Sequence, residues 1–202
     1  MLRRLLKGLI VFAGLVLAAP GAAACQLTRS VNVFRTFGEL YSLVPGLIGR
    51  YIRAAYYHMT LAKCPLNLNI GIFSKFNHRE SQVGDMVMIG SYCSIGLVTL
   101  ADHSACAEKT SVLSRSPQHN FTDPSRLVMT ESNAPSRVTI GYDSHVGAGC
   151  MVLANIGEKC IVGPGSVVVT DIDDYSIALG NPARVVRKRE RADAVAALER
   201  PS

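Results

Sequence analysis

The chain has 202 residues, of which 49% are hydrophobic, 18% charged and 6% aromatic, with 17 Gly, 6 Cys and no Trp. This composition fits one globular domain with a real core, and it excludes collagen-like, disordered and small disulfide-stapled chains. The net charge of +6 comes from basic clusters without interleaved aromatic residues, so no nucleic-acid partner is expected. The scarcity of aromatic residues favours thin layers of small and β-branched side chains, so internal repeats are sought first.

Residues 1–24 have the form of a signal peptide. Three basic residues precede an apolar stretch from Gly8 to Ala19, and small residues follow up to Cys25. The apolar stretch of about 12 residues is shorter than the roughly 20 that a transmembrane helix needs. This segment alone therefore leaves open cleavage on export, shallow insertion and a monotopic anchor.

Residues 25–65 are expected to form a helical leader. A helix is predicted over 40–63, with Pro45 in its first turn and apolar residues at three- and four-residue steps. Two interpretations of this helix remain open: a surface helix packed on the main domain, or an interfacial helix at lipid headgroups. The basic and aromatic residues that the second interpretation uses are Arg50, Tyr51, Arg53, Tyr56 and Tyr57.

A six-residue repeat begins at Val83. Each hexad starts with an aliphatic residue, continues with Gly or an acidic residue, and has a small residue at its fifth position. Because this period is neither 3.6 nor 2, each hexad is interpreted as one short strand and a corner, with the first residue pointing inward. The hexads begin at Val83, Ile89, Ile95, Ala101 and Ala107, then at Ile140, Val146, Ile156 and Val162, with an early one at Ile70.

The repeat is interrupted twice. Residues 113–133 contain Pro117 and Pro124 and are expected to leave the coil as an extended loop, and loops of this length are usually functional or disordered. Between Met151 and Ile156 only 152–155 stand where a full hexad is expected, so one corner should be shortened.

Over about residues 66–189 these features resemble the left-handed parallel β-helix acyltransferases of the hexapeptide-repeat superfamily. The tail from Val162 to the Gly-Asn-Pro-Ala-Arg turn at 180–184 looks like the closing coil of sugar O-acetyltransferases. The segment 43–64 is similar to a subgroup associated with capsule and exopolysaccharide synthesis. The resemblance implies an all-β main domain, a left-handed β-helix over 66–180, followed by a turn and a short basic helix over 181–202.

The resemblance also implies a homotrimer whose active sites lie in clefts between neighbouring β-helices. Acetyl-CoA would be the cosubstrate, with no bound cofactor or metal, and basic residues would hold its phosphates. The alternative is that Arg184 and Arg187 belong to a solvated basic C-terminus and bind no phosphate. By motif position, Ala148 and Pro164 would line the pantetheine arm, Val169 and Thr170 would lie on the same coil edge, and Arg184 and Arg187 would meet the phosphates.

His119 matches the family's loop histidine. As a general base it would take the proton of a sugar hydroxyl that attacks the thioester directly, so no acyl-enzyme is required. Without the hexads it would be an ordinary exposed loop histidine. Asp123 can orient the imidazole or only start a turn with Pro124. Lys109 stands where well-studied members have the Asn that stabilises the oxyanion, so it either meets an acidic acceptor or faces solvent.

Two further departures concern His145 and the cysteines. His145 stands where the family often has Trp, which weakens any transfer of acceptor details. Nucleophilic roles for the cysteines are weighed against packing at small interior corners, and packing is favoured. The cysteines of the repeat are Cys93, Cys106, Cys150 and Cys160.

Two other function classes are considered. A zinc enzyme like the γ-class carbonic anhydrases is disfavoured because the five histidines, His58, His78, His103, His119 and His145, include no close pair. A non-catalytic membrane-tethered scaffold is disfavoured because the loop keeps its histidine.

The cellular compartment expected for the chain follows from that of acetyl-CoA, the acetyl donor. Acetyl-CoA is cytosolic, so the chain is expected in the cytoplasm, with residues 1–24 as an uncleaved inner-membrane anchor and the cysteines reduced. The acceptor is expected to be a free nucleotide sugar, a lipid-linked repeat or a finished polysaccharide, and the donor an acetyl or a longer acyl thioester.

Overall fold

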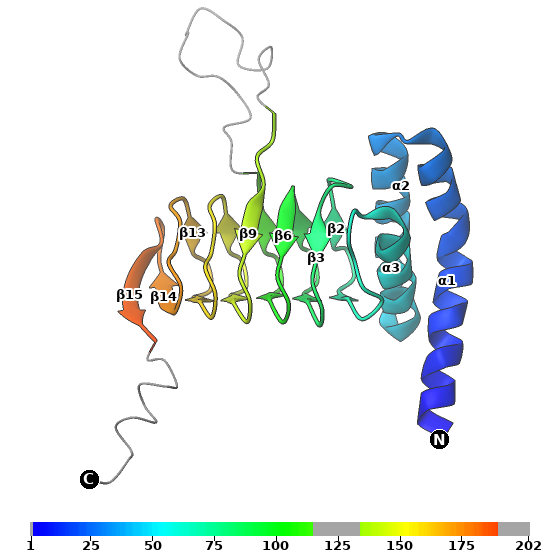
Figure 1. Ribbon diagram of the computed structural model, residues 1–202, viewed down its shortest axis with the longest axis horizontal. Helices are drawn as coiled ribbons and strands as arrows, with labels where there is room; N and C mark the ends of the chain where they lie inside the picture. The colour runs from blue at the N-terminus through cyan, green and yellow to red at the C-terminus, as the bar shows by residue number, and fades with distance from the viewer. Residues whose placement is uncertain (1, 115–133, 190–202) are drawn as a thin grey trace, which may run out of the picture.

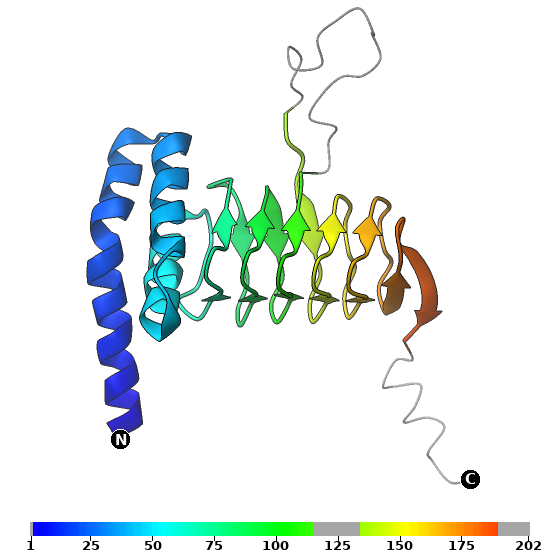
Figure 2. The same ribbon diagram turned by 180° about the vertical axis from the view of Figure 1, so that it is seen from behind.

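Three helices stand across one end of a stack of short β-strands (Figures 1 and 2). The computed structural model describes residues 2–114 and 134–189. The helices are α1 (Leu2–Thr28), α2 (Val31–Ser42) and α3 (Gly46–Thr60). The last strand, β15 (Arg184–Lys188), lies at the opposite end of the stack (Figure 1).

The strands form three sheets. Sheet I contains β1 (Asn69–Ile70), β4 (Met88–Ile89), β7 (Ala105–Cys106), β10 (His145–Val146), β12 (Ile161–Val162), β14 (Ser176–Leu179) and β15. Sheet II contains β2 (Lys75–Phe76), β5 (Ser94–Ile95), β8 (Ser111–Val112), β11 (Met151–Val152) and β13 (Val167–Val168). Sheet III contains β3 (Gln82–Val83), β6 (Val98–Leu100) and β9 (Val138–Ile140), and isolated bridges through Ile156 and Ile172 extend it.

The chain visits the three sheets in turn, so it winds as a three-sided parallel β-helix. Every pairing between these strands is parallel except that of β14 with β15. Each turn of the coil has three corners, which we call the I–II, II–III and III–I corners after the sheets that they join. The six-residue repeat predicted this architecture because one short strand and one corner fill about six residues.

The inward positions follow the hexads with one shift. Val83, Ile89 and Ile95 are buried as predicted, but Ala101 and Ala107 are only half-buried, so the prediction for these two alanines is wrong. Leu100 and Cys106 point inward instead. The step from Ile95 to Leu100 covers five residues, which moves the following hexads back by one position.

The predicted shortened corner after Val152 is confirmed. Ile156 pairs with Ile140 in sheet III only four residues after the inward Val152. The following coil is shortened in the same way, because Ile172 pairs with Ile156 four residues after the inward Val168.

Glycine at the corners lets adjacent coils approach. At Gly141, an added Cβ would overlap the backbone of Gly157 in the next coil. Gly141→Ala is therefore expected to lower the free energy of unfolding by about 1–3 kcal/mol, because two hydrogen-bonded coils must separate. Gly8→Ala is the matched control: no atom lies within 4 Å of its added Cβ, and alanine there should stabilise α1 by about 0.5–1 kcal/mol. Chemical denaturation of both variants checks this, and an unchanged Gly141→Ala midpoint would contradict it.

Helix α1 continues through the predicted boundary at residue 24. Residues Gly8–Thr28 form a helical stretch of 21 residues that is apolar and long enough to cross a membrane by length and composition alone. The estimate of about 12 apolar residues was wrong because the small residues after Ala19, with Pro20 among them, stay helical. Signal sequences and core helices pass the same test, so this length does not decide between the three alternatives.

The helix predicted over 40–63 is confirmed over Gly46–Thr60, but its predicted bounds are too wide. Helix α2 ends at Ser42 and α3 begins at Gly46, with Pro45 as its N-cap. Arg53 is buried, and its Nε and Nη1 donate to the carbonyls of Ile70 (3.1 Å) and Val44 (2.7 Å).

The two consecutive tyrosines of α3 are buried as well. The Tyr56 hydroxyl donates to the Phe34 carbonyl (2.8 Å), and the Tyr57 hydroxyl accepts from the backbone N–H of Phe76 in the first coil (3.2 Å). This face of α3 caps the β-helix, so the packed interpretation holds for Arg53, Tyr56 and Tyr57, while Arg50 and Tyr51 are only half-buried.

The predicted basic C-terminal helix is wrong over residues 184–188. These residues form β15, which pairs antiparallel with β14 and closes sheet I. The turn before it brings the backbone N–H of Ala183 to the Val167 carbonyl (2.8 Å), which ties the end of the chain to sheet II. An edge strand forms here because Val185 and Val186 have high strand propensity.

Candidate active site

The extended loop joins the coil at the II–III corner. The chain leaves the described coil after Ser114, which follows β8, and returns at Ala134, before β9 (Figure 1). Arg137 fixes the return: its Nη1 donates to the Val98 carbonyl (3.0 Å) and its Nη2 to the Glu80 carbonyl (2.7 Å). The predicted catalytic residues His119 and Asp123 lie outside the described residues.

The I–II corner is a column of turns that are hydrogen-bonded from coil to coil. Its outermost residues have backbone φ between 60° and 70°. Each backbone N–H after the first donates to the turn of the preceding coil, at 2.8 to 2.9 Å. These residues are Phe73, Tyr92, Lys109, Gly149 and Gly165, in the order of the coils.

Lys109 occupies the middle of this column. Its backbone N–H donates to the Ser91 carbonyl (2.9 Å) and its side chain is exposed. It belongs to the coil whose next corner carries the extended loop, with only β8 between them. Lys109 therefore stands in the coil from which the extended loop departs.

Ala148 and Pro164 lie on adjacent turns of the same corner, and both are exposed. They are joined because the Gly165 N–H donates to the Ala148 carbonyl (2.8 Å). No atom lies within 4 Å of a Cβ added at Gly149 or Gly165. Towards the C-terminal end the corner is therefore a surface of backbone and two small side chains, along which an elongated ligand can lie.

Val169 and Thr170 do not share this edge. They follow β13 and lie at the II–III corner, so the prediction of one common coil edge is wrong. Both are exposed. These four of the six predicted donor-binding residues thus flank sheet II from its two sides, with Val167 on the strand between them.

Strand β15 places Arg184 close to this surface and Arg187 farther away. Arg184 pairs with Leu179, whose side chain fills the space that a Cβ on Gly163 would need, next to Pro164. Arg187 pairs with Ile177, towards the III–I corner. Arg184, Arg187 and Lys188 are all exposed. The Arg184 Nη1 donates to the neighbouring Ala183 carbonyl (3.0 Å), the Lys188 Nζ to the Ser176 hydroxyl (2.9 Å) and the Arg189 Nη1 to the Lys159 carbonyl (2.7 Å).

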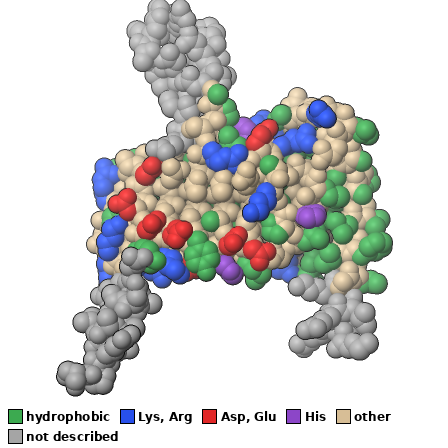
Figure 3. Space-filling view, viewed as in Figure 1, with side chains coloured by type: hydrophobic (Ala, Val, Ile, Leu, Met, Phe, Trp, Pro, Cys, Tyr) green, Lys and Arg blue, Asp and Glu red, His purple; other side chains and the backbone are tan. Residues whose placement is uncertain are grey.

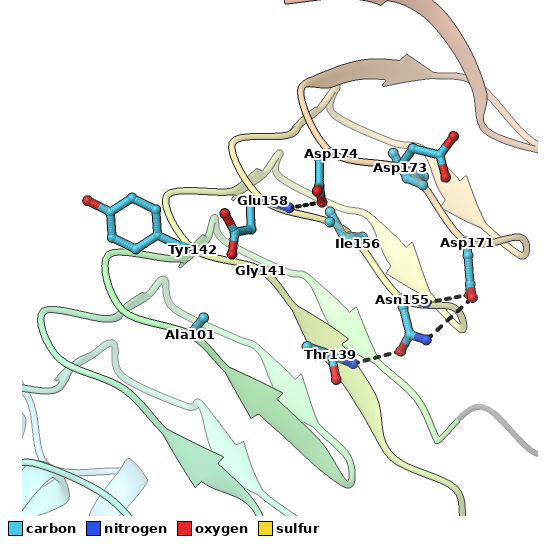
Figure 4. A pocket seen from close by; sticks show the side chains of 12 residues that line it. Ala101, Thr139, Gly141, Tyr142, Asn155, Ile156, Glu158, Asp171, Asp173 and Asp174 are labelled. Carbon is cyan, nitrogen blue, oxygen red and sulfur yellow. Dashed lines mark hydrogen bonds between the residues drawn. The ribbon is translucent and has the colours of Figure 1, made fainter. Parts of the chain in front are cut away.

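The outer face of sheet III carries an acidic groove of about 620 Å³ (Figure 4). The Asn155 Oδ1 accepts from the Thr139 N–H (2.9 Å), and the Asp174 Oδ1 accepts from the Glu158 N–H (2.8 Å), so these side chains join adjacent coils. Acidic side chains are grouped along one side of the coil in Figure 3. Since like charges repel, this groove does not suit the phosphates of coenzyme A. Its acidic residues are Glu158, Asp171, Asp173 and Asp174.

The cysteines are buried thiols. Burial raises the pKa of Cys64 to about 12, and it also raises the pKa of Cys93, Cys106, Cys150 and Cys160. All 6 cysteines are free and buried. Neutral, inaccessible thiols do not serve as nucleophiles, which agrees with the packing role predicted for the four in the repeat.

This burial predicts slow thiol chemistry. At pH 8 the native protein should react with Ellman's reagent at least about 100-fold more slowly than a free thiol, because the thiolate is rare and shielded. Raising the pH through the elevated pKa values should increase the rate, and denaturant should release all 6 thiols. A rapidly reacting cysteine in the native protein would contradict the prediction.

The described histidines are spread over the molecule. His145 lies on the outer face of sheet I in β10, His103 on the III–I corner beside the Tyr142 ring, His78 on the II–III corner between β2 and β3, and His58 in α3. Within 2–114 and 134–189, no group of three or more His, Cys, Asp or Glu side chains is arranged to hold a metal ion.

Two exposed aromatic residues of the I–II corner were not predicted as site residues from the sequence. Phe73 and Tyr92 are exposed by 40% and 57%, and their rings stack with centroids 4.8 Å apart. The signal that could have found them is the corner register, since Tyr92 stands one coil and Phe73 two coils before Lys109.

No family model matches the chain. Over 123 residues, 60% of this chain and 35% of the relative, it is 36% identical to the "Probable acetyltransferase Rv3034c" of Mycobacterium tuberculosis. Over 51 residues, 24% of this chain and 27% of the relative, it is 45% identical to the dTDP-3-amino-3,6-dideoxy-alpha-D-galactopyranose 3-N-acetyltransferase of Aneurinibacillus thermoaerophilus. The chain spans about a third of the length of these curated relatives or less.

Solved structures share the fold. A maltose O-acetyltransferase from Clostridium difficile superposes with a TM-score of 0.71 at 20% identity, over 82% of this chain and 89% of that one. The hexapeptide-repeat acetyltransferase VCA0836 of Vibrio cholerae gives 0.60 at 17% identity, over 80% and 93%. The N-acyltransferase AntD of Bacillus cereus, in complex with dTDP and 3-hydroxybutyryl-CoA, gives 0.50 at 18% identity, over 70% and 90%.

Proposed function

Because the chain is related in sequence and fold to the hexapeptide-repeat acetyltransferases, we propose that it transfers an acetyl group from acetyl-CoA to a sugar hydroxyl. The observation that carries the proposal is the C-terminal half of the I–II corner. There Ala148 and Pro164 leave an open surface that ends at the Leu179 side chain, and Leu179 pairs with the exposed Arg184. A long anionic thioester needs such a surface for its arm and a cation for its phosphates.

The donor would lie along the corner with its phosphates at Arg184 and its thioester towards Lys109. Arg187 would meet the phosphates from farther along β15, and Val169 and Thr170 would approach the donor across sheet II. The AntD structure, with an acyl-CoA bound, is consistent with a donor of this class. The acidic groove on sheet III also supports placing the donor at the I–II corner, since the negative charge of the groove repels the phosphates of coenzyme A.

The reaction proposed is a direct attack in a ternary complex. His119 takes the proton of the sugar hydroxyl, whose oxygen forms a bond to the thioester carbonyl carbon. The carbon–sulfur bond then breaks, and the thiolate of coenzyme A leaves and receives a proton. Asp123 would orient the imidazole, and the ammonium of Lys109 would stabilise the oxyanion or bind an acidic group of the acceptor. Imidazole suits this role because it is largely neutral above its usual pKa of about 6.5.

The proposal extends to the assembly. Three chains would form a homotrimer of left-handed β-helices, with each active site in the cleft between two neighbours and His119 reaching it on the extended loop. The acceptor would belong to surface polysaccharide biosynthesis, as a nucleotide sugar, a lipid-linked repeat or the polymer. The relatives named as sugar-modifying acetyltransferases support a carbohydrate acceptor.

Thiol release from acetyl-CoA, measured with a panel of sugar acceptors, tests the proposal. Sugar-dependent release above the rate of hydrolysis is expected, together with lower acetylation of cell polysaccharide when the gene is deleted. If no sugar stimulates release by the full chain, the proposed function is wrong.

We also propose that the chain is cytoplasmic and stays attached to the inner membrane through α1. The outward face of this helix exposes large apolar side chains, with Leu9 70% and Phe12 67% exposed. Residues 1–63 contain 8 Lys or Arg and only 1 Asp or Glu, whereas residues 64–202 contain 13 and 14. An apolar face on a strongly basic module suits an anionic lipid surface.

Leu9→Ser together with Phe12→Ser is expected to weaken binding to vesicles that contain anionic lipid. The loss should be at least about tenfold, since each large apolar side chain contributes about 1.5–3 kcal/mol when it is fully buried. Sedimentation with the vesicles measures it, and neutral vesicles serve as the control for the charge contribution. Equal binding by the variant and the natural chain would contradict the proposal.

A further inference from the structure

The I–II corner has two halves of different chemistry on either side of Lys109. Towards the C-terminal end its column residues are Gly149 and Gly165, which leave the surface bare. Towards the helices they are Phe73 and Tyr92, whose stacked rings are exposed. All of them share the same left-handed backbone conformation, so the coil geometry alone does not explain why one half carries aromatic rings.

The aromatic half is held firmly in place. The Phe73 N–H donates to the carbonyl of Ser42 at the end of α2 (2.9 Å), and the Tyr92 N–H donates to the Ile72 carbonyl (2.9 Å). The two rings lie with centroids 4.8 Å apart and 26° between their planes. They form an ordered, partly apolar surface that continues the column on which Lys109 stands.

Resting on the proposed acetyl transfer, we infer that Phe73 and Tyr92 form the binding platform for the acceptor sugar. Because the two rings stack on each other, one face of each is occupied, so a pyranose would pack its C–H groups on the outer face of the pair while its hydroxyls remain at the rim for polar contacts. The polar side chains of this part of the corner are the Tyr92 hydroxyl, the Lys109 ammonium, the half-buried Ser91 hydroxyl and the exposed Glu108 carboxylate. Lys109 would select acceptors that carry a carboxylate or phosphate.

The order of residues along the corner supports this assignment. Adjacent strands in a sheet are about 4.8 Å apart, so Phe73 lies two coils, about 10 Å, from Lys109 on one side. Gly165 lies the same distance from Lys109 on the other side. Donor and acceptor would therefore approach one transfer point from opposite directions, beside the coil that carries the loop of His119.

The binding test compares the natural full-length chain with Phe73→Ala/Tyr92→Ala. Tyr142→Ala is the matched control, because Tyr142 is 40% exposed at a different corner. Saturation-transfer NMR would use the methyl β-glycosides of glucose, galactose, N-acetylglucosamine and glucuronic acid as probes. We expect the ring C–H signals of at least one probe to be saturated by the natural chain, and its apparent Kd to rise at least about tenfold in the double variant but not in Tyr142→Ala.

Single substitutions of Tyr92 show whether binding needs an aromatic ring or only an apolar side chain. Tyr92→Phe should keep most of the binding to the best probe, whereas Tyr92→Leu should lose it despite a similar apolar size. Equal melting temperatures of the variants establish that the fold is retained. The inference is overturned if the natural chain binds none of the four probes, or if the double variant binds them as well as Tyr142→Ala does.

Acetyl-transfer kinetics separate this inference from the proposed function. The double variant should raise KM for the best acceptor and leave KM for acetyl-CoA unchanged. If the natural chain transfers acetyl groups and the double variant does so with the same acceptor KM, the platform is wrong and the function stands. If the natural chain binds a probe at the corner but transfers nothing, the platform stands and the proposed function fails.

Discussion

His119→Ala is expected to lower kcat for acetyl transfer by about 10²–10⁴-fold, the usual contribution of a positioned general base. The hydroxyl of a sugar is a weak nucleophile unless its proton is removed as it attacks. Without the imidazole the proton must pass to water or to a base that is not positioned for it. The measurement is thiol release at saturating acetyl-CoA, with the acceptor that gives the highest rate in the natural chain.

The variant should keep its affinity for coenzyme A, because the residues proposed to hold the donor lie on the coil and on β15. Sedimentation velocity and CoA binding serve as controls and should be unchanged. Asp123→Asn should have a smaller effect if this carboxylate only orients the imidazole. Turnover by His119→Ala that equals that of the natural chain would contradict a catalytic role for the loop.

A chain that begins at Cys25 is expected to lose on the order of 5 kcal/mol of stability, or roughly 10–20 °C in Tm. The removed part of α1 contributes to the core, since Ala18 and Ala22 are buried in it. The Tyr41 hydroxyl donates to the Leu17 carbonyl (3.3 Å). Gly21 lies so close to the Phe37 ring that an added Cβ would be 2.6 Å from it.

Thermal unfolding of the shortened chain measures this loss. The matched control is Leu9→Ser with Phe12→Ser, which changes α1 only on its exposed face and should leave Tm within a few degrees. The structural role of α1 supports the proposal that residues 1–24 are retained. A shortened chain as stable as the full one, or a mature cellular form beginning near Cys25, would contradict it.

The repeat was predictable because its period is a direct consequence of the coil. One strand and one corner need about six residues, and the inward positions tolerate only aliphatic or small side chains. The shift at Leu100 escaped the sequence analysis because Ala101 and Ala107 are also small and apolar, so they satisfy the pattern from the wrong position. The pairing of Leu100 with the inward residues Val83 and Ile140 resolves it.

The helices were less predictable because their faces are chosen by tertiary packing. Arg53, Tyr56 and Tyr57 suit a lipid interface by composition, but α3 uses them to cap the first coil through hydrogen bonds to distant carbonyls and N–H groups. The prediction of a C-terminal helix was wrong over residues 184–188 for a related reason. The free edge of β14 offers this basic, valine-containing segment backbone hydrogen bonds, which a prediction from local sequence does not include.

The sequence predicted which residues belong to the candidate site better than it predicted where they lie on the coil. Motif position alone does not tell which corner a residue occupies when coils are shortened, so Val169 and Thr170 were assigned to the wrong edge. The aromatic residues Phe73 and Tyr92 were missed because nothing local marks them. Their relation to Lys109 exists only through the stacking of three successive coils.

Acetyl transfer itself is tested most directly with acetyl-CoA that carries a ¹³C-labelled acetyl group. The full-length chain is incubated with this donor and the sugar panel, and the products are analysed by NMR and mass spectrometry. The proposal predicts a labelled ester on a sugar hydroxyl, formed together with one equivalent of free coenzyme A and absent with His119→Ala. Label found only as free acetate, or on no sugar at all, would contradict it.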